Sequence, residues 1–513
     1  MYIQRLLPNL YRDSVSLMQL SAALGKLPGV EQASAVMATP GNLEFLRQAG
    51  LVDGDIAPRP NDLLVAVRGK STAQLEAALQ AALASLNNES VQSVGGAVAE
   101  APLRSLQMAL GRTPQANLAL ISVPGDYAAA EAMKALRLGL HVMLFSDNVA
   151  LADEVALKRY AAGRGLLVMG PDCGTAIVDG VPLGFANAVR RGAVGVVGAS
   201  GTGTQQVTSL VHRRGGGISH AIGTGGHDLG KDVGGITMLH GLGLLARDAD
   251  TKVIVLISKP PSPAIAREVI AAARKAGKPV VINFIGSTED PSGGNLHVSR
   301  TLDEAASAAV ALAKGRKPSR AVAAAIRLPK IRFKKSQRYI RGLFSGGTFC
   351  YEASAILGQG TPPERTVWSN APVDPKRAIE DPWKSREHTL IDLGDDVFTR
   401  GRPHPMIDLR LRNERMLEEA ADPQVAVILL DVVLGYGSHA DPASELVPAI
   451  QKAQAIARKK GRTLAVVASV CGTDEDPQGL ERQEAALRDA AVLLTESNAS
   501  AARLAGAIAA KLS

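Results

Sequence analysis

The sequence predicts an α/β protein that is built from several domains. The chain has 513 residues, which is more than one ordinary domain holds. Short apolar runs alternate with longer segments of helical periodicity along the chain, as in folds where helices cover a sheet. A third observation is an internal repeat, because one order of strands, glycine-rich turns and helices occurs twice in the second half.

The amino-acid composition is typical of a globular protein and argues against some classes of function. Hydrophobic residues make up 46% of the chain and charged residues 21%, which is typical of a globular protein. Aromatic residues make up only 3%, which argues against a stacking platform for single-stranded nucleic acid. The net charge of +8 is modest for this length. The basic run "PKIRFKKSQRYIR" (329–341) predicts a solvated linker, with a basic face for anionic substrates as the alternative.

Cysteine usage and hydropathy predict the compartment. Cys173, Cys350 and Cys471 are far apart and form neither a disulfide framework nor a CxxC metal pattern. The first residues lack a signal-peptide core, and no apolar run approaches the length of a membrane span. We therefore expect a cytoplasmic protein without a metal site, and without membrane or nucleic-acid partners.

Residues 1–112 predict a small α/β domain. Asp13 and Thr72 are expected to cap the first and third of its helices. The predicted strands lie at 2–11, 30–39 and 62–69, and the predicted helices at 13–27, 40–50 and 72–87.

Residues 113–190 predict a second domain with the order strand, helix, strand, helix, strand. The strands are continuously apolar, as in a parallel sheet that is covered on both faces. Ligands of such sheets bind beyond the carboxyl ends of the strands. The turn after the third strand holds Asp172 and Cys173. Cys173 would need a lowered pKa and a neighbouring base to act as a nucleophile, and a buried turn thiol is the preferred interpretation.

The internal repeat predicts two flavodoxin-like domains, at 191–316 and 338–513, joined by the basic linker. Each copy contains a strand that ends in a glycine-rich turn, a second strand with a Gly/Asp loop, and further strands and Ala-rich helices. The matching segments are 194–211 with 340–357, 220–263 with 389–442, and 274–287 with 459–473.

Each copy opens with a glycine-rich turn that leads directly into a helix. The first N–H groups of a helix lack internal partners and attract phosphate or carboxylate, and glycine lets the anion approach the backbone. The GxxxxGK[ST] pattern is absent, so neither turn is a P-loop. A tight turn without a ligand is the alternative, but two copies could aim both helix starts at one anion. The predicted phosphate-binding residues are Ser200, Gly201, Thr202, Gly203, Thr204, Ser345, Gly346, Gly347 and Thr348.

Loop residues in equivalent regions of the two copies are further candidates. Gly225, Gly226 and His227 precede the second helix of the first copy, and His404 occupies the corresponding loop of the second. For each histidine, a site role and a loop-structuring role are open. Arg402 could hold a substrate carboxylate or pair with a neighbouring aspartate (Asp395, Asp396 or Asp408). Two other histidines, at positions 212 and 388, are expected at the surface.

Several motifs carry a family resemblance. "LLVMGPDCGT" (166–175), "GVVGASGTGTQ" (195–205), "IDLGDD" (391–396) and "GRPHPMID" (401–408) resemble the succinyl-CoA synthetase superfamily, and most closely the FdrA family of acyl-CoA-synthetase-like proteins. The resemblance covers nearly the whole chain. It implies that 113–190 is a Rossmann-like CoA-binding-type domain, and that 191–316 and 338–513 are the two ligase domains. In that superfamily the two helices face one phosphorylated histidine.

The chain also departs from the synthetase pattern. The start of the CoA-binding-type domain lacks the glycine-rich turn, so CoA binding is open. His297 lies near the phosphohistidine position without the glycine context of that motif. No segment of ATP-grasp size is free. We therefore expect neither a complete nucleotide-forming synthetase nor a phosphohistidine.

The FdrA resemblance implies a function. Such proteins are implicated in allantoin breakdown, as one subunit of a carbamoyltransferase that interconverts oxalurate plus phosphate with oxamate plus carbamoyl phosphate. Companion subunits of a hetero-oligomer and a small anionic substrate are the implied partners. The candidate catalytic residues are Ser200, Ser345, Arg402 and His404, and the backbone N–H groups of the loops would stabilise the oxyanion. The alternatives are a CoA-binding acyl-CoA synthetase subunit and a non-catalytic scaffold.

Overall fold

The computed structural model describes residues 1–52, 59, 61–91, 103–318, 328, 330–359, 366–399 and 402–512. They fall into two compact units. The first unit comprises Met1–Asp172 and Asp396–Asp408, and the second comprises Cys173–Asp395 and Leu409–Ser513. No helix among the described residues has the length and apolar character needed to cross a bilayer.

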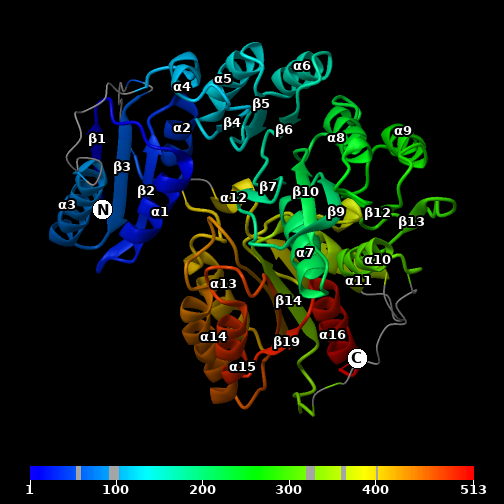
Figure 1. Ribbon diagram of the computed structural model, residues 1–513. Helices are drawn as coiled ribbons and strands as arrows, with labels where there is room; N and C mark the ends of the chain where they lie inside the picture. Colours follow the sequence, from blue (N-terminus) through cyan, green and yellow to red (C-terminus); the bar gives the residue numbers. More distant parts are fainter. Residues whose placement is uncertain are drawn as a thin grey trace. The chain divides into compact units, whose positions relative to one another are not determined.

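The first unit begins with a three-stranded antiparallel sheet in the order β1-β3-β2 (Figure 1). Alternation along β3 explains how the helices pack, because successive side chains of a strand face opposite sides. Val65 and Val67 contact α1 and α3, whereas Leu64 and Ala66 face the core that contains Leu46 of α2. The elements are β1 (Tyr2–Leu7), α1 (Ser14–Gly25), β2 (Val30–Met37), α2 (Pro40–Gln48), β3 (Leu63–Gly69) and α3 (Thr72–Val91).

One of the two predicted helix caps is confirmed and the other is wrong. The Asp13 carboxylate accepts a hydrogen bond from the backbone N–H of Ser16 at 3.0 Å, which is the geometry of an N-cap. Thr72 is instead the first residue of α3, and the first helical hydrogen bond runs from Leu75 N–H to the carbonyl of Ser71. The apolar period locates this helix but does not fix which of two adjacent hydroxyl residues caps it.

The predicted order of strand, helix, strand, helix, strand after residue 113 is confirmed. The three strands are parallel in the order β4-β5-β6. A Cβ on Gly125 would lie 2.6 Å from the carbonyl oxygen of Asn148, so only glycine lets the start of α5 approach the turn after β5. The elements are α4 (Leu106–Arg112), β4 (Leu118–Ile121), α5 (Gly125–Arg137), β5 (His141–Leu144), α6 (Leu151–Ala162) and β6 (Val168–Met169).

The second unit contains a seven-stranded sheet in the order β13-β12-β11-β9-β10-β7-β8. The parallel strands β10-β9-β11-β12-β13 have the flavodoxin order 2-1-3-4-5. The hairpin β7–β8 extends the sheet antiparallel to β10, although its residues lie within the segment 113–190. The elements are β7 (Thr175–Val178), β8 (Val181–Gly184), β9 (Arg191–Gly198), α7 (Gly201–Arg213), β10 (Ile218–Gly223), α8 (Ile236–Arg247), β11 (Val253–Ser258), α9 (Pro263–Arg274), β12 (Val280–Phe284), β13 (Leu296–Val298) and α10 (Leu302–Ala313).

A six-stranded parallel sheet in the same unit repeats this order. Its strands run β15-β16-β14-β17-β18-β19, so β16-β14-β17-β18-β19 again read 2-1-3-4-5. The two predicted flavodoxin-like copies are therefore present, while the exact domain boundaries stay a prediction. The elements are β14 (Tyr339–Phe344), α11 (Gly347–Gln359), β15 (Val367–Ser369), η1 (Pro375–Arg377), β16 (His388–Asp392), α12 (Asp396–Thr399, in the first unit), α13 (Arg410–Ala421), β17 (Val425–Val433), α14 (Pro442–Lys459), β18 (Ala465–Cys471), α15 (Leu480–Asp489), β19 (Leu493–Thr495) and α16 (Asn498–Ala510).

Polar groups on α7 join the two copies within the second unit. His212 is 2% exposed, so its predicted surface position is wrong. Its Nδ1 accepts the backbone N–H of Arg190, and its Nε2 lies 2.8 Å from Asp474 of the second copy. The helix is buried on most sides because β9, β10 and α10 of its own copy and α11 and β18 of the second copy pack against it. A sequence period alone does not reveal the neighbours from the second copy.

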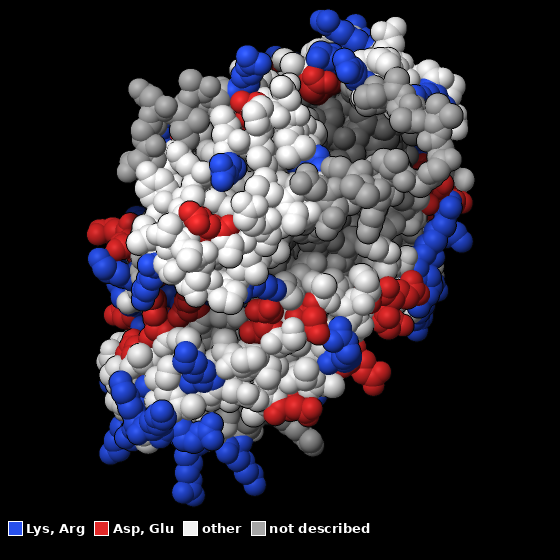
Figure 2. Space-filling model, turned by 90° about the vertical axis from the view of Figure 1, so that its left-hand side faces the viewer, with Lys and Arg blue, Asp and Glu red and all other residues white. Residues whose placement is uncertain are grey.

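The described part of the basic linker lies at the amino end of the second sheet. Lys334 donates a hydrogen bond to the carbonyl of Lys460, so linker lysines lie beside the basic end of α14, and residues 319–327 and 329 are outside the described part. Figure 2 shows Lys and Arg side chains gathered at the lower end of that view. The linker enters β14 at Tyr339, roughly 20 Å along this six-residue strand from the glycine-rich turn at its other end.

Candidate functional site

The first predicted loop caps its own helix. Ser200 has extended backbone geometry, and its hydroxyl accepts the backbone N–H of Gly203 at 2.9 Å. Thr204 is buried, and its hydroxyl donates to the carbonyl of Ser200 at 2.7 Å. Gly201 is exposed, so the N–H groups at the very start of α7 remain accessible from solvent.

The second predicted loop is held by a buried ion pair. The Asp431 carboxylate, on β17, accepts the backbone N–H groups of Ser345 and Gly346 at 2.8 and 2.9 Å and the Ser345 hydroxyl at 2.8 Å. Arg412 donates to the same carboxylate at 3.0 Å, and both charged side chains are at most 2% exposed. Asp431 therefore occupies the first N–H groups of this turn. The groups left for a ligand begin at Gly347 and Thr348.

The two loops meet, as the pseudo-symmetry of the copies predicts. The hydroxyls of Ser200 and Thr348 are hydrogen-bonded at 2.6 Å. A Cβ on Gly346 would lie 2.8 Å from the methyl group of Thr202, and a Cβ on Gly203 would lie 3.2 Å from that of Thr348. The first turns of α7 and α11 are thus in van der Waals contact, and their positive dipole ends lie side by side.

A carboxyl group and an ammonium group lie at this junction, and neither was singled out from the sequence. Asp392, the last residue of β16, is so close to Gly347 that any Cβ there would collide with its carboxylate. Burial raises the pKa of Asp392 to about 7, with Asp431 and Asp395 raising it further and the ammonium of Lys259 opposing them. Lys259 follows β11 of the first copy, and its ammonium lies 5.5 Å from the ring of Tyr351 on α11.

The other loop candidates of the second unit have structural contacts. Asp228 accepts the N–H groups of Thr237 and Met238, so the loop with Gly225, Gly226 and His227 is organised around the start of α8. His227 and Gly226 are exposed. Cys173 is buried, as expected for a turn thiol, with its sulfur 3.6 Å from the carbonyl of Thr175. Asp172, in the first unit, is exposed and left-handed, with φ of 55°.

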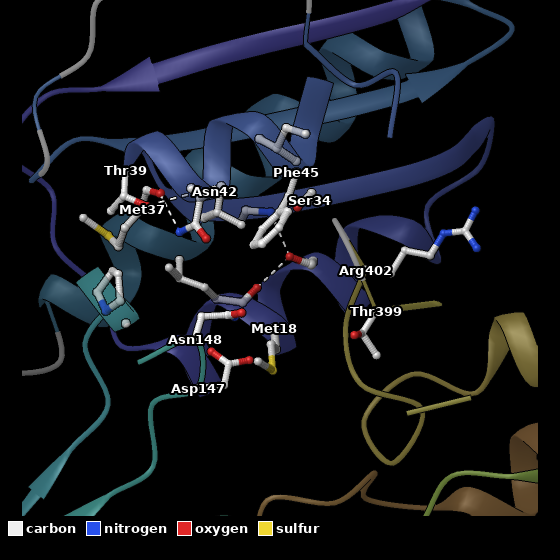
Figure 3. Close-up of a pocket in the computed structure, with 18 of the residues that line it drawn as sticks. Met18, Ser34, Met37, Thr39, Asn42, Phe45, Asp147, Asn148, Thr399 and Arg402 are labelled. Carbon is white, nitrogen blue, oxygen red and sulfur yellow. Dashed lines mark hydrogen bonds between the residues drawn. The ribbon is translucent and has the colours of Figure 1, made fainter. Parts of the chain in front are cut away.

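His404 and Arg402 belong to the first unit. His404 Nδ1 accepts the backbone N–H of Met406, and burial lowers the pKa of its ring to about 4, so it is uncharged near neutrality. Arg402 lines a cavity of about 340 Å³ in that unit. Figure 3 shows its guanidinium pointing away from Asp147 and Asn148.

His297 lies in the edge strand β13 and pairs with Val281 of β12. Three strand spacings separate β13 from β9, which places this histidine roughly 14 Å across the sheet from the strand that leads into α7. A histidine at this distance from the strand that leads into α7, and without the glycines of the phosphohistidine motif, is not placed as that motif would place it. The absence of a phosphohistidine stays a prediction.

Three family models match the chain. The model described as "AllF, heavy metal-associated domain" matches residues 1–102, "CoA binding domain" matches 189–286, and "CoA-ligase" matches 343–508. The protein YahF of Escherichia coli strain K12 is 46% identical over 505 residues, which is 97% of this chain and 96% of YahF. The chain belongs to the FdrA family.

More distant proteins match parts of this FdrA-family chain. The α-subunit of ADP-forming succinate–CoA ligase from Staphylococcus epidermidis is 30% identical over 182 residues, which is 35% of this chain and 59% of that subunit. Among solved structures, the dinucleotide-forming acetyl-coenzyme A synthetase 1 of Ca. Korarchaeum cryptofilum is 16% identical, and the match covers 77% of this chain and 83% of that chain with a TM-score of 0.32. By its family models, the FdrA-family chain combines an AllF-type domain with domains of the CoA-binding and CoA-ligase kinds.

The AllF-type domain does not fit a soft metal ion, despite the description of its model. Residues 1–102 contain neither cysteine nor histidine, so of the side chains that such ions prefer only methionine thioethers are present. In the described part of the FdrA chain, no three His, Cys, Asp or Glu side chains are grouped to hold a metal.

Sequence reasoning missed Asp392, Lys259 and the Asp431–Arg412 pair, although one signal was present. Asp431 interrupts the otherwise apolar run "VAVILLDVV" of β17, all of which is buried. A lone carboxylate in a buried strand needs a cation or several N–H donors, so its presence predicts a polar partner there. The partner itself lies 19 residues away in sequence, on α13.

Proposed function

We propose that this FdrA chain is the phosphate-handling subunit of a carbamoyltransferase that interconverts oxalurate plus phosphate with oxamate plus carbamoyl phosphate. The observation that carries the proposal is the 2.6 Å contact between Ser200 and Thr348, which joins two helix N-termini at one point. The AllF-type model match supports the allantoin context. Companion subunits complete the enzyme in this proposal.

The phosphate would bind where α7 and α11 meet. The N–H groups at Gly201 and Gly347 would donate hydrogen bonds to its oxygens, together with whichever hydroxyl of Ser200 and Thr348 accepts in their mutual hydrogen bond and so keeps its proton free. The ammonium of Lys259 supplies a positive charge on the same side, where it already acts on the Asp392 carboxyl. Ser345 would not touch the ligand, because its hydroxyl is bonded to Asp431.

The reaction needs a proton donor as well as an anion site. A phosphate oxygen attacks the terminal carbamoyl carbon of oxalurate, and the bond from that carbon to the inner nitrogen breaks. The leaving oxamate nitrogen must take up a proton. Asp392 can supply it, since a carboxyl group with a pKa of about 7 is partly protonated at neutral pH. In the reverse direction the same carboxylate accepts the proton from oxamate.

The Asp431–Arg412 pair positions this site without touching the reactants. It fixes the backbone of Ser345 and Gly346, and thereby the direction of the next N–H groups of α11. Asn370 performs a similar role for Asp392, because its side chain exchanges two hydrogen bonds of 2.9 Å with the backbone of that residue. Such fixed dipoles stabilise a developing oxyanion without rearranging during the reaction.

A second candidate is an acid–thiol ligase subunit that binds CoA. The matches to the CoA-binding and CoA-ligase models support it, and residues 189–286 and 343–508 carry those matches. Both candidates need an acyl phosphate at the paired helix ends. They differ in whether a thiol or an amide nitrogen is the acyl acceptor.

The test is an assay of carbamoyl phosphate formation from oxalurate and phosphate, with the chain alone and with its companion subunits. Replacing Gly201 by valine should lower the rate about a hundredfold, because a side chain there blocks approach to the α7 backbone. The protein should still fold, since a Cβ at Gly201 meets only the Thr175 hydroxyl, at 3.5 Å.

The matched control is Gly358→Val near the other end of α11, where a Cβ meets nothing within 4 Å. This variant should retain the full rate. Thioester formation that depends on CoA, together with no carbamoyl phosphate in any combination of subunits, would contradict the carbamoyltransferase proposal and favour the ligase.

A further inference from the structure

The first unit contains a cavity that the proposed phosphate site does not use. It has a volume of about 340 Å³ and lies at the carboxyl ends of β4 and β5, beside α1 and α2 of the N-terminal domain. Ligands of parallel α/β sheets bind at such strand ends, and cavities of this size hold small molecules. The residues of its wall and rim come from within that one unit.

Part of the cavity lining is apolar. Leu17 and Met18 of α1, Met37 of β2, Phe45 of α2 and Val123 after β4 line it. Figure 3 shows Met18, Met37 and Phe45 around the same space as Asn42 and Asn148. These side chains can cover the flat faces of a small planar molecule, and they disfavour a ligand that is charged throughout.

The lining is also acidic. Asp126, Asp147 and Asp396 line the cavity. Burial raises the pKa of Asp147, and the charge of nearby Asp396 raises it further. Among the described residues of the lining the one cation is Arg402, and its guanidinium points away from Asp147 in Figure 3. Carboxylates accept hydrogen bonds and donate none while they are ionised.

The two helix N-termini at the cavity do not offset this acidity. Thr39 caps α2 by accepting the N–H of Asn42, and the Asn42 side chain donates to the carbonyl of Met37. The Asp126 carboxylate lies in the first turn of α5, and a Cβ on Gly41 of α2 would be 3.7 Å from its oxygen. Both helix ends therefore already face a protein carboxylate or a capping hydroxyl.

We infer that this cavity binds an uncharged ureide or amide, whose paired N–H groups donate to Asp147 and whose planar body packs against Met18 and Phe45. A carboxylate can accept two N–H groups of one urea unit side by side. The phosphates of CoA do not fit this lining, because three carboxylates would face them. The choice of a ureide over an organic cation rests on the proposed function, whose substrates carry amide and ureide groups, although each of those substrates also carries a carboxylate that the proposed ligand of this cavity lacks.

Titration calorimetry on the full chain, without phosphate or companion subunits, tests the inference. The probes are allantoin as an uncharged cyclic ureide, agmatine as an organic cation, succinate, and CoA. Allantoin should bind and the other three should not. Asp147→Asn should weaken allantoin binding about tenfold, since an ionised acceptor is replaced by an amide.

Two further variants make the test specific. Gly41→Leu places a side chain toward Asp126 and into the cavity without changing its charge, and it should abolish allantoin binding. Asp153→Asn removes an exposed carboxylate from the first turn of α6, outside the lining, and should leave the affinity unchanged. Far-ultraviolet circular dichroism checks that each variant is folded.

Equal allantoin affinity in the wild type and Asp147→Asn, or tighter binding of CoA or agmatine, would overturn the inference. These results are separable from those of the transfer assay. If carbamoyl phosphate is not formed but allantoin binds, and Asp147→Asn weakens that binding, the inference about the cavity is supported and the proposed function is contradicted. If carbamoyl transfer occurs and allantoin does not bind, only the inference about the cavity is contradicted.

Discussion

At the scale of single residues, the site depends on carboxylates whose surroundings differ. Asp431 pairs with Arg412 and accepts three further hydrogen bonds, and it serves to fix the turn before α11. Asp392 lies at the end of a neighbouring strand. The backbone N–H of Gly394 and the more distant Lys259 lower its pKa, but burial raises the pKa and is the larger effect. Two aspartates of the same sheet therefore have different tasks, one structural and one suited to proton transfer.

Replacing Asp392 by asparagine tests the second task. The raised pKa of about 7 means that the folded state holds the proton where the unfolded state, with a pKa near 3.8, has lost it. The wild type therefore loses stability as pH rises from about 4 to about 7, and the variant should not show this loss. The rate of carbamoyl transfer should fall at least about a hundredfold.

Denaturant unfolding at a series of pH values, together with the pH profile of the rate, measures both effects. Asp489→Asn on α15 is the matched control, because this aspartate is exposed and far along the chain from the site. If wild type and Asp392→Asn have parallel stability profiles and equal rates, Asp392 does not titrate near neutrality and is not the proton donor.

At the scale of elements, the contact between α7 and α11 requires glycine at one position in particular. A Cβ on Gly346 would lie 2.8 Å from Thr202 of the facing helix. Gly346→Ala should therefore push the two helix starts apart and lower the free energy of unfolding by about 1–3 kcal/mol. Gly358→Ala, near the carboxyl end of α11, should not lower the free energy of unfolding, because a Cβ there meets nothing within 4 Å and alanine is the better helix former. Calorimetric unfolding of the second unit measures both, and equal stability of the two variants would contradict this packing.

The sequence was sufficient to predict most elements and the place of both glycine-rich turns. The alternating apolar periods indicate the strands and helices, and the duplicated order indicates two sheets of the 2-1-3-4-5 type. The contacts between the two copies could not be predicted from the sequence, because they depend on how two separately folded sheets pack. His212 illustrates this, since its partner Asp474 is 262 residues away. For the same reason Lys259, on the first copy, could not be assigned to a carboxyl group of the second.

At the scale of the whole molecule, a duplicated fold has placed two equivalent helix ends against each other within one chain. Each unit also has its own candidate site, with paired helix ends in the second and an acidic cavity in the first. The membership in the FdrA family covers nearly the full length, so both sites lie within the part that matches YahF. Anion binding is proposed for the second unit and ureide binding for the first.

The most direct test of the central claim is the binding of inorganic phosphate to the full chain, followed by calorimetry or by the ³¹P line width. We predict one phosphate per chain, with affinity lost in Gly201→Val on α7 and reduced about tenfold in Thr348→Val on α11, because both helix ends hold the same anion. Two independent phosphates per chain, or one phosphate whose affinity Thr348→Val leaves unchanged, would contradict a single site built by both copies.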